Sequence, residues 1–429
     1  MKEINISVIG LGTVGSSVIS SIENINKNLK NKNNTLINII GISAKNKNKS
    51  RSIDISKYKW VDDPIELTNN NNCHVIIELI GQEKGLSYEI IKSSLQNKIN
   101  VITANKALLA NFGNELFQIA EKNDVNIFYE AAVAGGIPII NILKNSLFFN
   151  KIKNISGILN GTTNYILSSM EKNNLSFQNA LDLASEKGYA ESDPTNDIEG
   201  IDSAHKITLL SSLCYGIKIN HKYSKYQGIK NFNSADIRYS RKLGYKIKLI
   251  SESSLINNKI FINTAPKLIS LKNPLAHVDG VLNAINIETD HLKSLFFEGE
   301  GAGGLATSSS VIADLFEIIK TSTLKNPGYN ASILREVSAY DADNLKNSFY
   351  MRIIVKDQPG VLSKITSILT AKNISIQTIL QLNEEKINNR IPIILTTYDT
   401  FERDLISAKQ DIGKESFVED DIITITIQN

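Results

Sequence analysis

The sequence predicts an α/β protein with a parallel β-sheet in its N-terminal third and a smaller α+β module at its C-terminal end. Two observations predict the parallel sheet. In residues 4–25 an apolar run leads through a glycine-rich turn into a helical pattern, and apolar runs then alternate with helical stretches as far as residue 129. A third observation predicts the C-terminal module, because a new strand–turn–helix pattern begins at Phe349.

Length and composition set limits on the class of protein. The 429 residues suggest two or three domains, and a net charge of +3 argues against nucleic acid or an anionic membrane as a partner. Cys73 and Cys214 show no metal-ligand spacing and form no disulfide framework, which favours a reducing compartment. No apolar run is long enough to span a bilayer, and a turn beginning at Gly10 leaves no room for a signal peptide. We therefore expect a soluble, cytoplasmic protein.

The first strand, turn and helix form a dinucleotide-binding pattern. Ile4–Ile9 is apolar, and helical spacing follows the turn. Gly10 permits a tight turn, Gly12 lets the backbone approach a pyrophosphate, and Gly15 lets the helix pack on the strand. An ordinary tight turn is the alternative, but the flanking strand and helix favour a Rossmann-type dinucleotide-binding domain. Its cofactor contacts are expected from Gly10, Leu11, Gly12, Thr13, Val14 and Gly15.

Further elements continue this α/β pattern. The polar stretch Asn24–Thr35 is expected to be a long loop. Near-continuous apolar strands that alternate with helices imply a parallel sheet covered on both faces. The expected strands are 36–42, 75–80, 100–104 and 125–129, and the expected helices are 87–97 and 107–122.

The segment after the second strand bears on the choice of cofactor. The acidic residue that usually binds the ribose 2′-hydroxyl of NAD is missing there. Hydroxyl and basic side chains suit a 2′-phosphate, so NADP is favoured and NAD stays possible; the alternative is a merely solvated loop. The residues concerned are Ser43, Lys45, Lys47, Lys49 and Arg51.

Two loops carry isolated chemical groups. Lys106 follows the strand 100–104, at the end where ligands of open α/β sheets bind, although a surface lysine is the plain alternative. Glu130 opens a bent loop that ends at Pro138, and its carboxylate with backbone carbonyls could hold a hard cation. A turn before a helix is the alternative for that loop.

The segment from Gly188 to Lys206 is the richest in candidate groups. It places five carboxylates in a loop that runs into a helix. Asp202 and Lys206 are four residues apart, on one helical face. Exposed, they would be a weak ion pair; buried, they would form a proton-transfer station, and the pattern alone leaves both interpretations open.

Six segments together resemble homoserine dehydrogenases, in the order found in that family. The resemblance covers about residues 4–320. The segments are the glycine turn 10–15, Thr103–Lys106, Glu130–Pro138, Asn160–Tyr165, Glu191–Lys206 and Glu300–Thr307.

The resemblance implies an activity and roles for individual residues. The family interconverts L-homoserine and L-aspartate 4-semialdehyde with NAD(P)(H). Lys206 would be the general acid, Lys106 would lie beside the reacting oxygen and the nicotinamide, and Asp202 would orient Lys206 or the substrate. Glu191 would bind the homoserine amino group and Asp197 would support the pocket. Two neighbouring lysines would repel, which would lower the pKa of one of them.

The resemblance also implies an ion and further cofactor contacts. Gly188 and the turn 301–303, with Gly303, would line the nicotinamide ribose. A structural sodium ion would be held by Glu130 and by the carbonyls of Val133, Gly135 and Ile137.

The C-terminal module resembles an ACT domain, a βαββαβ fold that binds amino acids at subunit interfaces. A strand over Phe349–Val355 leads through the turn Asp357–Gly360 into an amphipathic helix. Later strands are expected at 374–379, 391–396 and 422–427. The resemblance implies a ligand near Gly360 and threonine as the effector; a role in oligomerisation alone is the alternative.

The sequence therefore predicts a monofunctional homoserine dehydrogenase of threonine, methionine and isoleucine biosynthesis, assembled as a homodimer or homotetramer. The expected boundaries are a nucleotide-binding domain at 1–135, completed by about 301–325, an α+β catalytic and dimerisation domain at 136–300, a linker at 326–348 and a regulatory domain at 349–429. The alternatives are another nicotinamide-dependent dehydrogenase and a non-catalytic sensor of NADP and amino acids. The presence of both Lys106 and Lys206 argues against the sensor.

Overall fold

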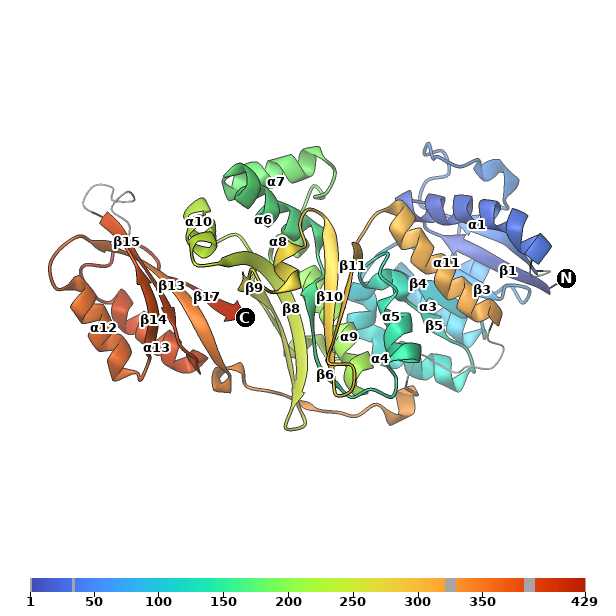
Figure 1. Cartoon of the computed structure of the whole chain (residues 1–429). Coiled ribbons are helices and arrows are strands. Elements are labelled where there is room, and N and C mark those ends of the chain that lie inside the picture. The colour runs from blue at the N-terminus through green and yellow to red at the C-terminus, as the bar shows by residue number, and fades with distance from the viewer. Residues whose placement is uncertain (1, 33–34, 321–328, 382–389, 429) are drawn as a thin grey trace.

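The computed structural model describes residues 2–32, 35–320, 329–381 and 390–428. Figure 1 shows three parts along one axis, which we call the N-terminal part, the central part and the tail. Within the described ranges, no helix combines the length and the apolar character needed to cross a membrane.

The N-terminal part contains a five-stranded parallel sheet, as the sequence predicted. Its strand order is β2-β1-β3-β4-β5. β2 is added on one side of β1 and the later strands on the other side, so the strand order reverses between β1 and β3. Ligands of such sheets bind at that reversal, beyond the carboxyl ends of the strands. The strands are β1 (Lys2–Ile9), β2 (Thr35–Ser43), β3 (Val75–Glu78), β4 (Asn100–Thr103) and β5 (Ile127–Phe128).

Helices cover this sheet, and one of them comes from a distant part of the chain. Helix α11 (Gly304–Lys320) packs against α1 (Thr13–Lys32) and shares its hydrophobic core. The predicted loop at 24–35 is wrong in most of its length, because α1 continues to Lys32; Lys and Leu favour a helix, and no Gly or Pro interrupts it. The other helices are η1 (Ile55–Lys57), α2 (Ile65–Thr68), α3 (Leu86–Gln96) and α4 (Lys106–Lys122).

The central part is an antiparallel sheet with helices packed against it. The order β11-β10-β6-β8-β9 is joined by antiparallel pairs throughout. Its strands are β6 (Ile152–Ile158), β8 (Tyr245–Ile256), β9 (Lys259–Ser270), β10 (Leu282–Thr289) and β11 (Ser294–Glu300). Helices α6 (Gly161–Asn173), α9 (Ile201–Tyr215) and α10 (Ser234–Lys242) pack against β8. The shorter elements are η2 (Glu130–Ala132), α5 (Ile139–Asn141), η3 (Ile142–Ser146), α7 (Phe177–Glu186), α8 (Thr195–Ile198), η4 (His221–Tyr223) and η5 (Pro274–His277).

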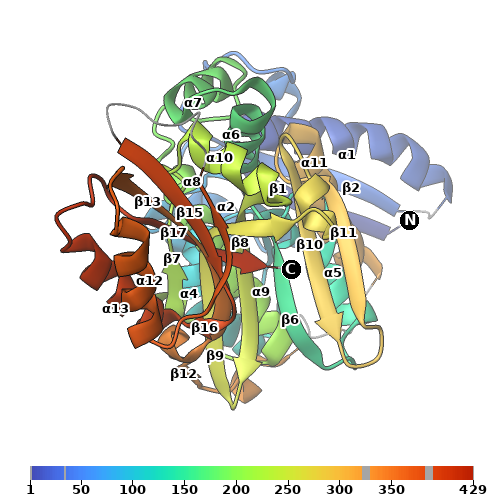
Figure 2. The ribbon, with the colours of Figure 1, turned by 60° about the vertical axis from the view of Figure 1, so that its left-hand side comes forward.

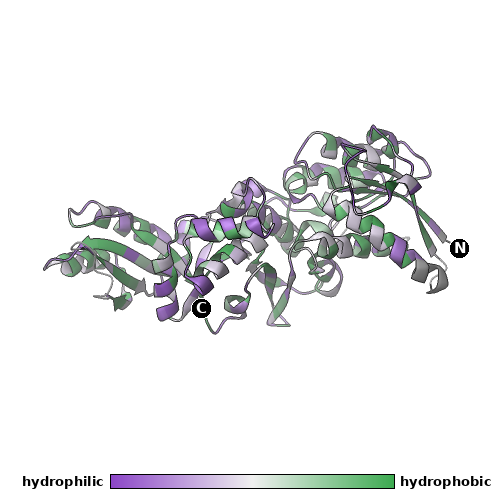
Figure 3. Cartoon of the chain, turned by 90° about the horizontal axis from the view of Figure 1, so that it is seen from above, coloured by the Kyte–Doolittle hydropathy of each residue, from purple (hydrophilic) through white to green (hydrophobic). Residues whose placement is uncertain are grey.

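The tail has the strand order β17-β13-β15-β14, which confirms the predicted βαββαβ fold. Its elements are β13 (Lys346–Lys356), α12 (Val361–Ala371), β14 (Ile376–Leu380), β15 (Arg390–Thr397), β16 (Thr400–Phe401), α13 (Glu402–Gly413) and β17 (Ile423–Gln428). Figure 3 shows hydrophobic residues along the strands, and helices on which hydrophobic and hydrophilic residues alternate.

The sheet of the tail continues the sheet of the central part. One edge of β9 is paired in turn by β12 (Ser338–Ala339), β7 (Ser224–Tyr226) and β17, all in parallel register. Thr426 of β17 lies opposite Lys267 of β9, and Figure 2 shows the strands of the tail crossing close to β8 and β9. Sequence patterns suggested a separate module, because a pairing between residues 159 positions apart, such as Lys267 and Thr426, leaves no local signal.

The segment before the tail is attached to the central part. The predicted linker begins at 326–328, which lie outside the described residues. The following residues include η6 (Ala331–Ile333) and η7 (Ala342–Asn344). Arg335 donates from its backbone N–H to Gly216 O and from its guanidinium to Tyr215 O. Backbone pairing with β9 also fixes this segment, so it is not an irregular connection.

Candidate active site

The glycine turn after β1 is shaped by close contacts at two of its glycines. A Cβ on Gly10, whose φ is +99°, would lie 2.5 Å from the backbone of Leu79, and one on Gly15 would lie 2.0 Å from Gly10 O. A Cβ on Gly12 would meet nothing within 4 Å. Gly10 and Gly15 therefore allow the turn and the helix to pack, whereas Gly12 leaves open space in front of the start of α1.

A second glycine turn, at 301–304, lies against the first. A Cβ on Gly304 would lie 2.7 Å from Ser17 Oγ and 3.1 Å from Thr13 Cγ2. Gly303 has a φ of +114° and open space around its Cα. The second turn therefore packs against the start of α1 through Gly304, and a Cβ at Gly303 would point into open space; its contact with the nicotinamide ribose stays a prediction.

The basic loop after β2 contacts the glycine turn through Arg51. Its guanidinium donates to Leu11 O over 3.3 Å and to the carbonyls of Lys47 and Lys49, and it lies 5.7 Å from the centre of the Trp60 ring. These bonds fold the loop back onto the turn, so its positive charge lies beside the predicted cofactor site.

Lys106 is fixed at the start of α4 by a buried hydrogen-bond network. Asn105 caps the helix by accepting from Leu108 N–H. Thr103 Oγ1 donates over 2.7 Å to Glu78, a completely buried carboxylate at the end of β3 that also accepts from Ile80 N–H. Sequence reasoning assigned no role to Glu78; the signal was a carboxylate at the carboxyl end of an apolar strand.

Lys106 and Lys206 meet at a single carboxylate. Asp202 Oδ2 lies 2.7 Å from Lys206 Nζ, and Asp202 Oδ1 lies 3.2 Å from Lys106 Nζ. Asp202 and Lys206 are buried on α9, whereas the Lys106 side chain is 39% exposed. Of the two interpretations of the pair Asp202 and Lys206, exposed or buried, the structure shows the buried one. The partly exposed ammonium group beside it belongs to Lys106.

Asn160 donates hydrogen bonds to both carboxylates of this cluster, Asp197 and Asp202. Sequence reasoning gave Asn160 no role. Its Nδ2 donates to Asp197 Oδ1 over 2.6 Å and to Asp202 Oδ2 over 3.0 Å. Its Oδ1 caps α6 by accepting from Thr163 N–H. An Asn before Gly161 indicates a helix cap, but contacts with carboxylates 37 and 42 residues away cannot be inferred from that pattern.

Electrostatics in the cluster follow from these contacts. Burial alone would raise the pKa of Asp202, but the ammonium groups of Lys206 and Lys106 hold it well below its usual range. Burial raises the pKa of Asp197, helped by the charge of Asp202. The charge of Asp202 also raises the pKa of Lys106. Repulsion between the lysines was expected to lower the pKa of one of them, and for Lys106 that prediction is wrong, because a carboxylate lies between the two ammonium groups.

Glu191 and Gly188 lie in an exposed loop beside the lysines. Glu191 makes no hydrogen bond or ion pair within the described residues, but its charge contributes to raising the pKa of Lys106. Gly188 has a φ of +72° and open space around it. Thr162 fixes the loop by donating to Tyr189 O over 2.7 Å.

The loop predicted to hold sodium is a tightly bonded turn. The Glu130 carboxylate accepts from the backbone N–H groups of Ile140 and Asn141, over 2.7 and 2.8 Å, and burial raises its pKa to about 7. Gly135 O accepts from the Ser310 hydroxyl, and Ile137 O accepts from a backbone N–H. No group of three or more His, Cys, Asp or Glu suited to a metal occurs in the described part of the chain.

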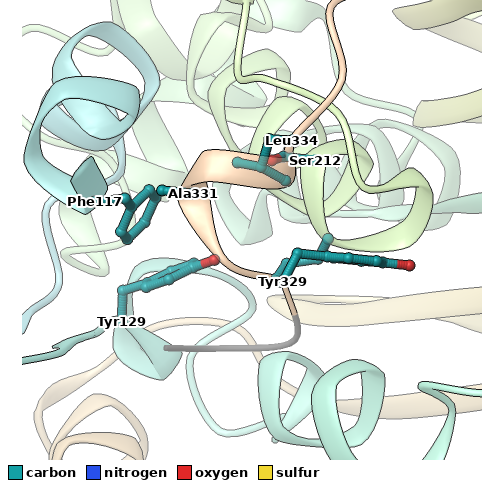
Figure 4. A pocket seen from close by; sticks show the side chains of 7 residues that line it. Phe117, Tyr129, Ser212, Tyr329, Ala331 and Leu334 are labelled. Atoms are coloured by element: carbon teal, nitrogen blue, oxygen red, sulfur yellow. The ribbon is translucent and has the colours of Figure 1, made fainter. Parts of the chain in front are cut away.

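A small apolar cavity lies away from these groups. It measures about 20 Å³ and is lined by Phe117, Tyr129, Ser212 and residues of the 329–334 segment (Figure 4). A space of this size holds no more than about one water molecule. None of the predicted site residues lines it, so it is not part of the candidate active site.

Comparison with known proteins identifies the family. Residues 10–130 match the model of the NAD-binding domain of homoserine dehydrogenase, residues 138–316 match that of homoserine dehydrogenase, and residues 349–417 match the ACT domain. The homoserine dehydrogenase of Neisseria gonorrhoeae is 37% identical over 435 aligned residues, which cover 100% of this chain and 99% of the relative. The chain belongs to the homoserine dehydrogenase family.

Solved homoserine dehydrogenases share all or most of this fold. A structure from Thiobacillus denitrificans has a TM-score of 0.93 with 32% identity and covers 100% of this chain and 99% of its own. A hyperthermophilic archaeal homoserine dehydrogenase, a mutant in complex with NADPH, has a TM-score of 0.62 with 27% identity and covers 75% of this chain and 99% of its own. This homoserine dehydrogenase is therefore an oxidoreductase that acts on a CH–OH group, and the comparisons give no support to a non-catalytic sensor.

Proposed function

We propose that Lys206 is the general acid of this homoserine dehydrogenase and that Lys106 binds the reacting oxygen beside it. The support is the number of hydrogen-bond donors. An ammonium group has three N–H donors, and Lys206 directs two of them to Asp202 and to Leu159 O. One N–H donor of Lys206 is left for a ligand. Lys106 also has N–H donors that are not used by Asp202.

This arrangement suits the reduction of a carbonyl. A bound nicotinamide supplies or accepts the hydride. The two ammonium groups stabilise the negative charge that develops on the substrate oxygen, and Lys206 transfers the proton to it. Asp202 keeps the ammonium group of Lys106 charged and holds both ammonium groups in place. In the oxidation of homoserine, Lys206 accepts the hydroxyl proton.

The same proposal assigns the rest of the substrate. Glu191, exposed and unpaired within the described residues, binds the amino group of L-homoserine or L-aspartate 4-semialdehyde. Asp197 supports the pocket through Asn160.

The observation that carries the proposal is the Lys106–Asp202–Lys206 cluster at the carboxyl end of β4. The test is an assay with L-homoserine and either NADP⁺ or NAD⁺. We expect reduction of the cofactor; no turnover with either cofactor at alkaline pH would refute the proposal.

We also propose that NADP is the preferred cofactor and that its 2′-phosphate binds beside Arg51. Arg51 is held against the glycine turn by Leu11 O and against its own loop by Lys47 O. The NADPH complex of the archaeal relative supports the same choice. Equal values of kcat/KM with NADP⁺ and NAD⁺ would contradict it. The other cofactor contacts proposed are the turn residues 10–15, Lys106, Gly188 and Gly303.

We also propose a structural sodium ion at the 130–137 loop. Its ligands would be mainly backbone carbonyls, with a smaller part for Glu130 than the sequence resemblance implied. Carbonyl oxygens are hard donors that suit such an ion, and those of Val133, Gly135 and Ile137 lie in this loop. The Glu130 carboxylate is occupied by two backbone N–H groups, so the ion would be held mainly by main-chain oxygens. Replacing Na⁺ by a large organic cation at constant ionic strength should lower the melting temperature; an unchanged value would argue against the ion.

The remaining proposals concern organisation and context. We propose the domain boundaries given by the sequence, a homodimer or homotetramer, and threonine as an effector of the tail. A cytoplasmic location is supported by two buried cysteines without a disulfide. The place of the enzyme in threonine, methionine and isoleucine biosynthesis follows from homoserine as the product. Light scattering and an assay with threonine would test the assembly and the regulation.

A further inference from the structure

Glu78, at the end of β3, is a buried carboxylate to which the catalytic proposal gives no role. It is completely buried. In the parallel sheet it lies beside Ile9 of β1 on one side and beside Thr103 of β4 on the other. Ile9 precedes the glycine turn, and Thr103 precedes the loop to Lys106. Glu78 therefore lies between the two loops that the proposed reaction brings together.

Neutral donors hold this carboxylate. One oxygen accepts from the backbone N–H groups of Ile80 and Gly81, over 2.8 and 3.3 Å, and from Ser87 Oγ over 2.9 Å. The other oxygen accepts from Thr103 Oγ1 over 2.7 Å. A buried carboxylate is usually paired with a cation, but the donors to Glu78 within the described residues carry no charge. A group that only accepts suits these donors, whereas an amide would direct a donor at one of them.

The bond from Thr103 leads to Lys106. Thr103 Oγ1 also accepts from Asn105 N–H over 3.1 Å. Asn105 caps α4 by accepting from Leu108 N–H over 3.1 Å, and Lys106 is the first residue of that helix. Because Lys106 directly follows Asn105, the direction of its side chain depends on the conformation of Asn105. Glu78 therefore fixes the residue before Lys106 through one hydroxyl group.

The bonds from Ile80 and Gly81 hold the loop after β3, residues 79–82, which we call the cofactor loop. Leu79 N–H donates to Ile9 O over 2.7 Å, and a Cβ on Gly10 would lie 2.5 Å from the Leu79 backbone. Gly81 has a φ of +81°, and a Cβ there would meet nothing within 4 Å. The cofactor loop therefore packs against the glycine turn, with open space at Gly81.

A further bond joins the two loops into one ring. Asn105 Nδ2 donates to Gln82 O over 2.6 Å. The ring runs from Glu78 through Thr103 and Asn105 to Gln82, and back to Glu78 along the cofactor loop. A displacement of the cofactor loop therefore changes the contacts of Asn105, beside Lys106.

We propose that Glu78 is a positioning residue that couples the cofactor loop to Lys106. It touches neither substrate nor cofactor, because it is completely buried. Its carboxylate holds the cofactor loop against the glycine turn and, through Thr103, sets Lys106 beside the substrate oxygen. The inference rests on the proposed role of Lys106, and it adds the group that places Lys106 relative to the dinucleotide.

The first test is Glu78→Gln in the full-length enzyme. The amide oxygen can still accept from Ile80 and Gly81, but the amide NH2 then faces Thr103 Oγ1, whose hydroxyl proton loses its acceptor. Since a misplacement of about 1 Å can cost about a hundredfold in rate, we expect kcat to fall about ten- to a hundredfold. The Kd of NADPH, measured by fluorescence titration without substrate, should change by less than about threefold, because the bonds to the cofactor loop are kept.

Two variants of Thr103 test the same bond from its other side, and they keep the test open if Glu78→Gln does not fold. Thr103→Ser keeps the hydroxyl and should retain kcat within about twofold. Thr103→Val has a similar shape without the hydroxyl and should reproduce the loss of kcat. The matched control is Glu121→Gln near the other end of α4, where the carboxylate accepts from the backbone N–H and the hydroxyl of Ser332. It should leave kcat and the Kd of NADPH within about twofold.

A double-mutant cycle separates positioning from a general loss of stability. If Glu78 acts through Lys106, Glu78→Gln should lower kcat no further in an enzyme that already carries Lys106→Met. Losses that multiply in the double variant, or an unchanged kcat in both Glu78→Gln and Thr103→Val, would overturn the inference. An unchanged kcat in Lys106→Met would instead refute the proposed role of Lys106, so the two failures are distinguishable.

Discussion

Asp202 and Asp236 are both buried carboxylates bonded to cationic side chains, and their surroundings differ. Asp202 lies between Lys206, on its own helix, and Lys106. Asp236, at the start of α10, is bonded to Arg352 of β13 through two nitrogens, at 2.7 and 3.2 Å. The first carboxylate joins the N-terminal part to the central part, and the second joins the central part to the tail.

The two clusters differ in their exposure to solvent and in the N–H donors that remain available to a ligand. Arg352 is 5% exposed, and Asp236 also accepts from Tyr350 Oη and Asn233 N–H, so that cluster is closed. In the Asp202 cluster, Lys106 is 39% exposed and both lysines keep donors. The same chemistry is therefore structural where the carboxylate is bonded through both oxygens and the site is sealed. It is available for catalysis where donors and access remain.

The largest effect is expected from Lys206→Ala. Loss of a general acid should lower kcat by about a hundred- to ten-thousandfold. Steady-state assays with homoserine would measure the change, with Lys218→Ala as the control, because Lys218 is an exposed partner of Glu336. If kcat were kept and only the KM of the cofactor rose, Lys206 would not be the acid.

Asp236→Asn should damage stability and spare the chemistry. It leaves the guanidinium of Arg352 buried with an incomplete partner, a loss of about 3–5 kcal/mol in the free energy of unfolding. Denaturant titration would measure this loss. The control Asp411→Asn removes an exposed carboxylate bonded to Lys414, which should cost no more than about 1 kcal/mol. A loss that small for Asp236→Asn would show that the joint between tail and central part is weak.

A smaller effect is expected from Arg51→Ala. Loss of a charge-assisted contact with a 2′-phosphate should raise the KM of NADP⁺ about tenfold. The KM of NAD⁺ should change little, so the ratio of the two is the measurement. Lys59→Ala removes an exposed positive charge nearby and should leave that ratio unchanged. An equal rise for both cofactors would indicate that Arg51 only supports the turn.

Asp202→Asn should shift the pH profile of the reaction. In the folded enzyme the charge of Asp202 raises the pKa of Lys106. Removing that charge lowers this pKa, so the loss of kcat/KM at alkaline pH should begin at a lower pH. Profiles of the variant and of Asp193→Asn, an exposed carboxylate of the same loop, would show the difference. An alkaline limb that did not move would mean that Lys106 does not need its charge.

The N-terminal sheet could be predicted almost strand by strand, because each strand is a short apolar run bounded by turn residues and each crossover is local. The tail could be predicted for the same reason. The loop predicted at 24–35 was a local error, because α1 continues to Lys32. The contacts that sequence patterns missed join distant segments: β17 with β9, Arg352 with Asp236, and Asn160 with two carboxylates.

The sequence by itself determined which groups this enzyme has: a glycine turn for a dinucleotide, two lysines, a carboxylate one helical turn from one of them, and a βαββαβ tail. The tertiary structure decided what those groups do. Burial on α9 made the pair Asp202 and Lys206 part of the proposed catalytic cluster. The charge of Asp202 raised the pKa of Lys106, whereas repulsion between the lysines was expected to lower the pKa of one of them. The pairing of β17 with β9 joined the tail to the central part in one continuous sheet. Burial and long-range pairing depend on residues far apart in the chain, and no local pattern specifies them.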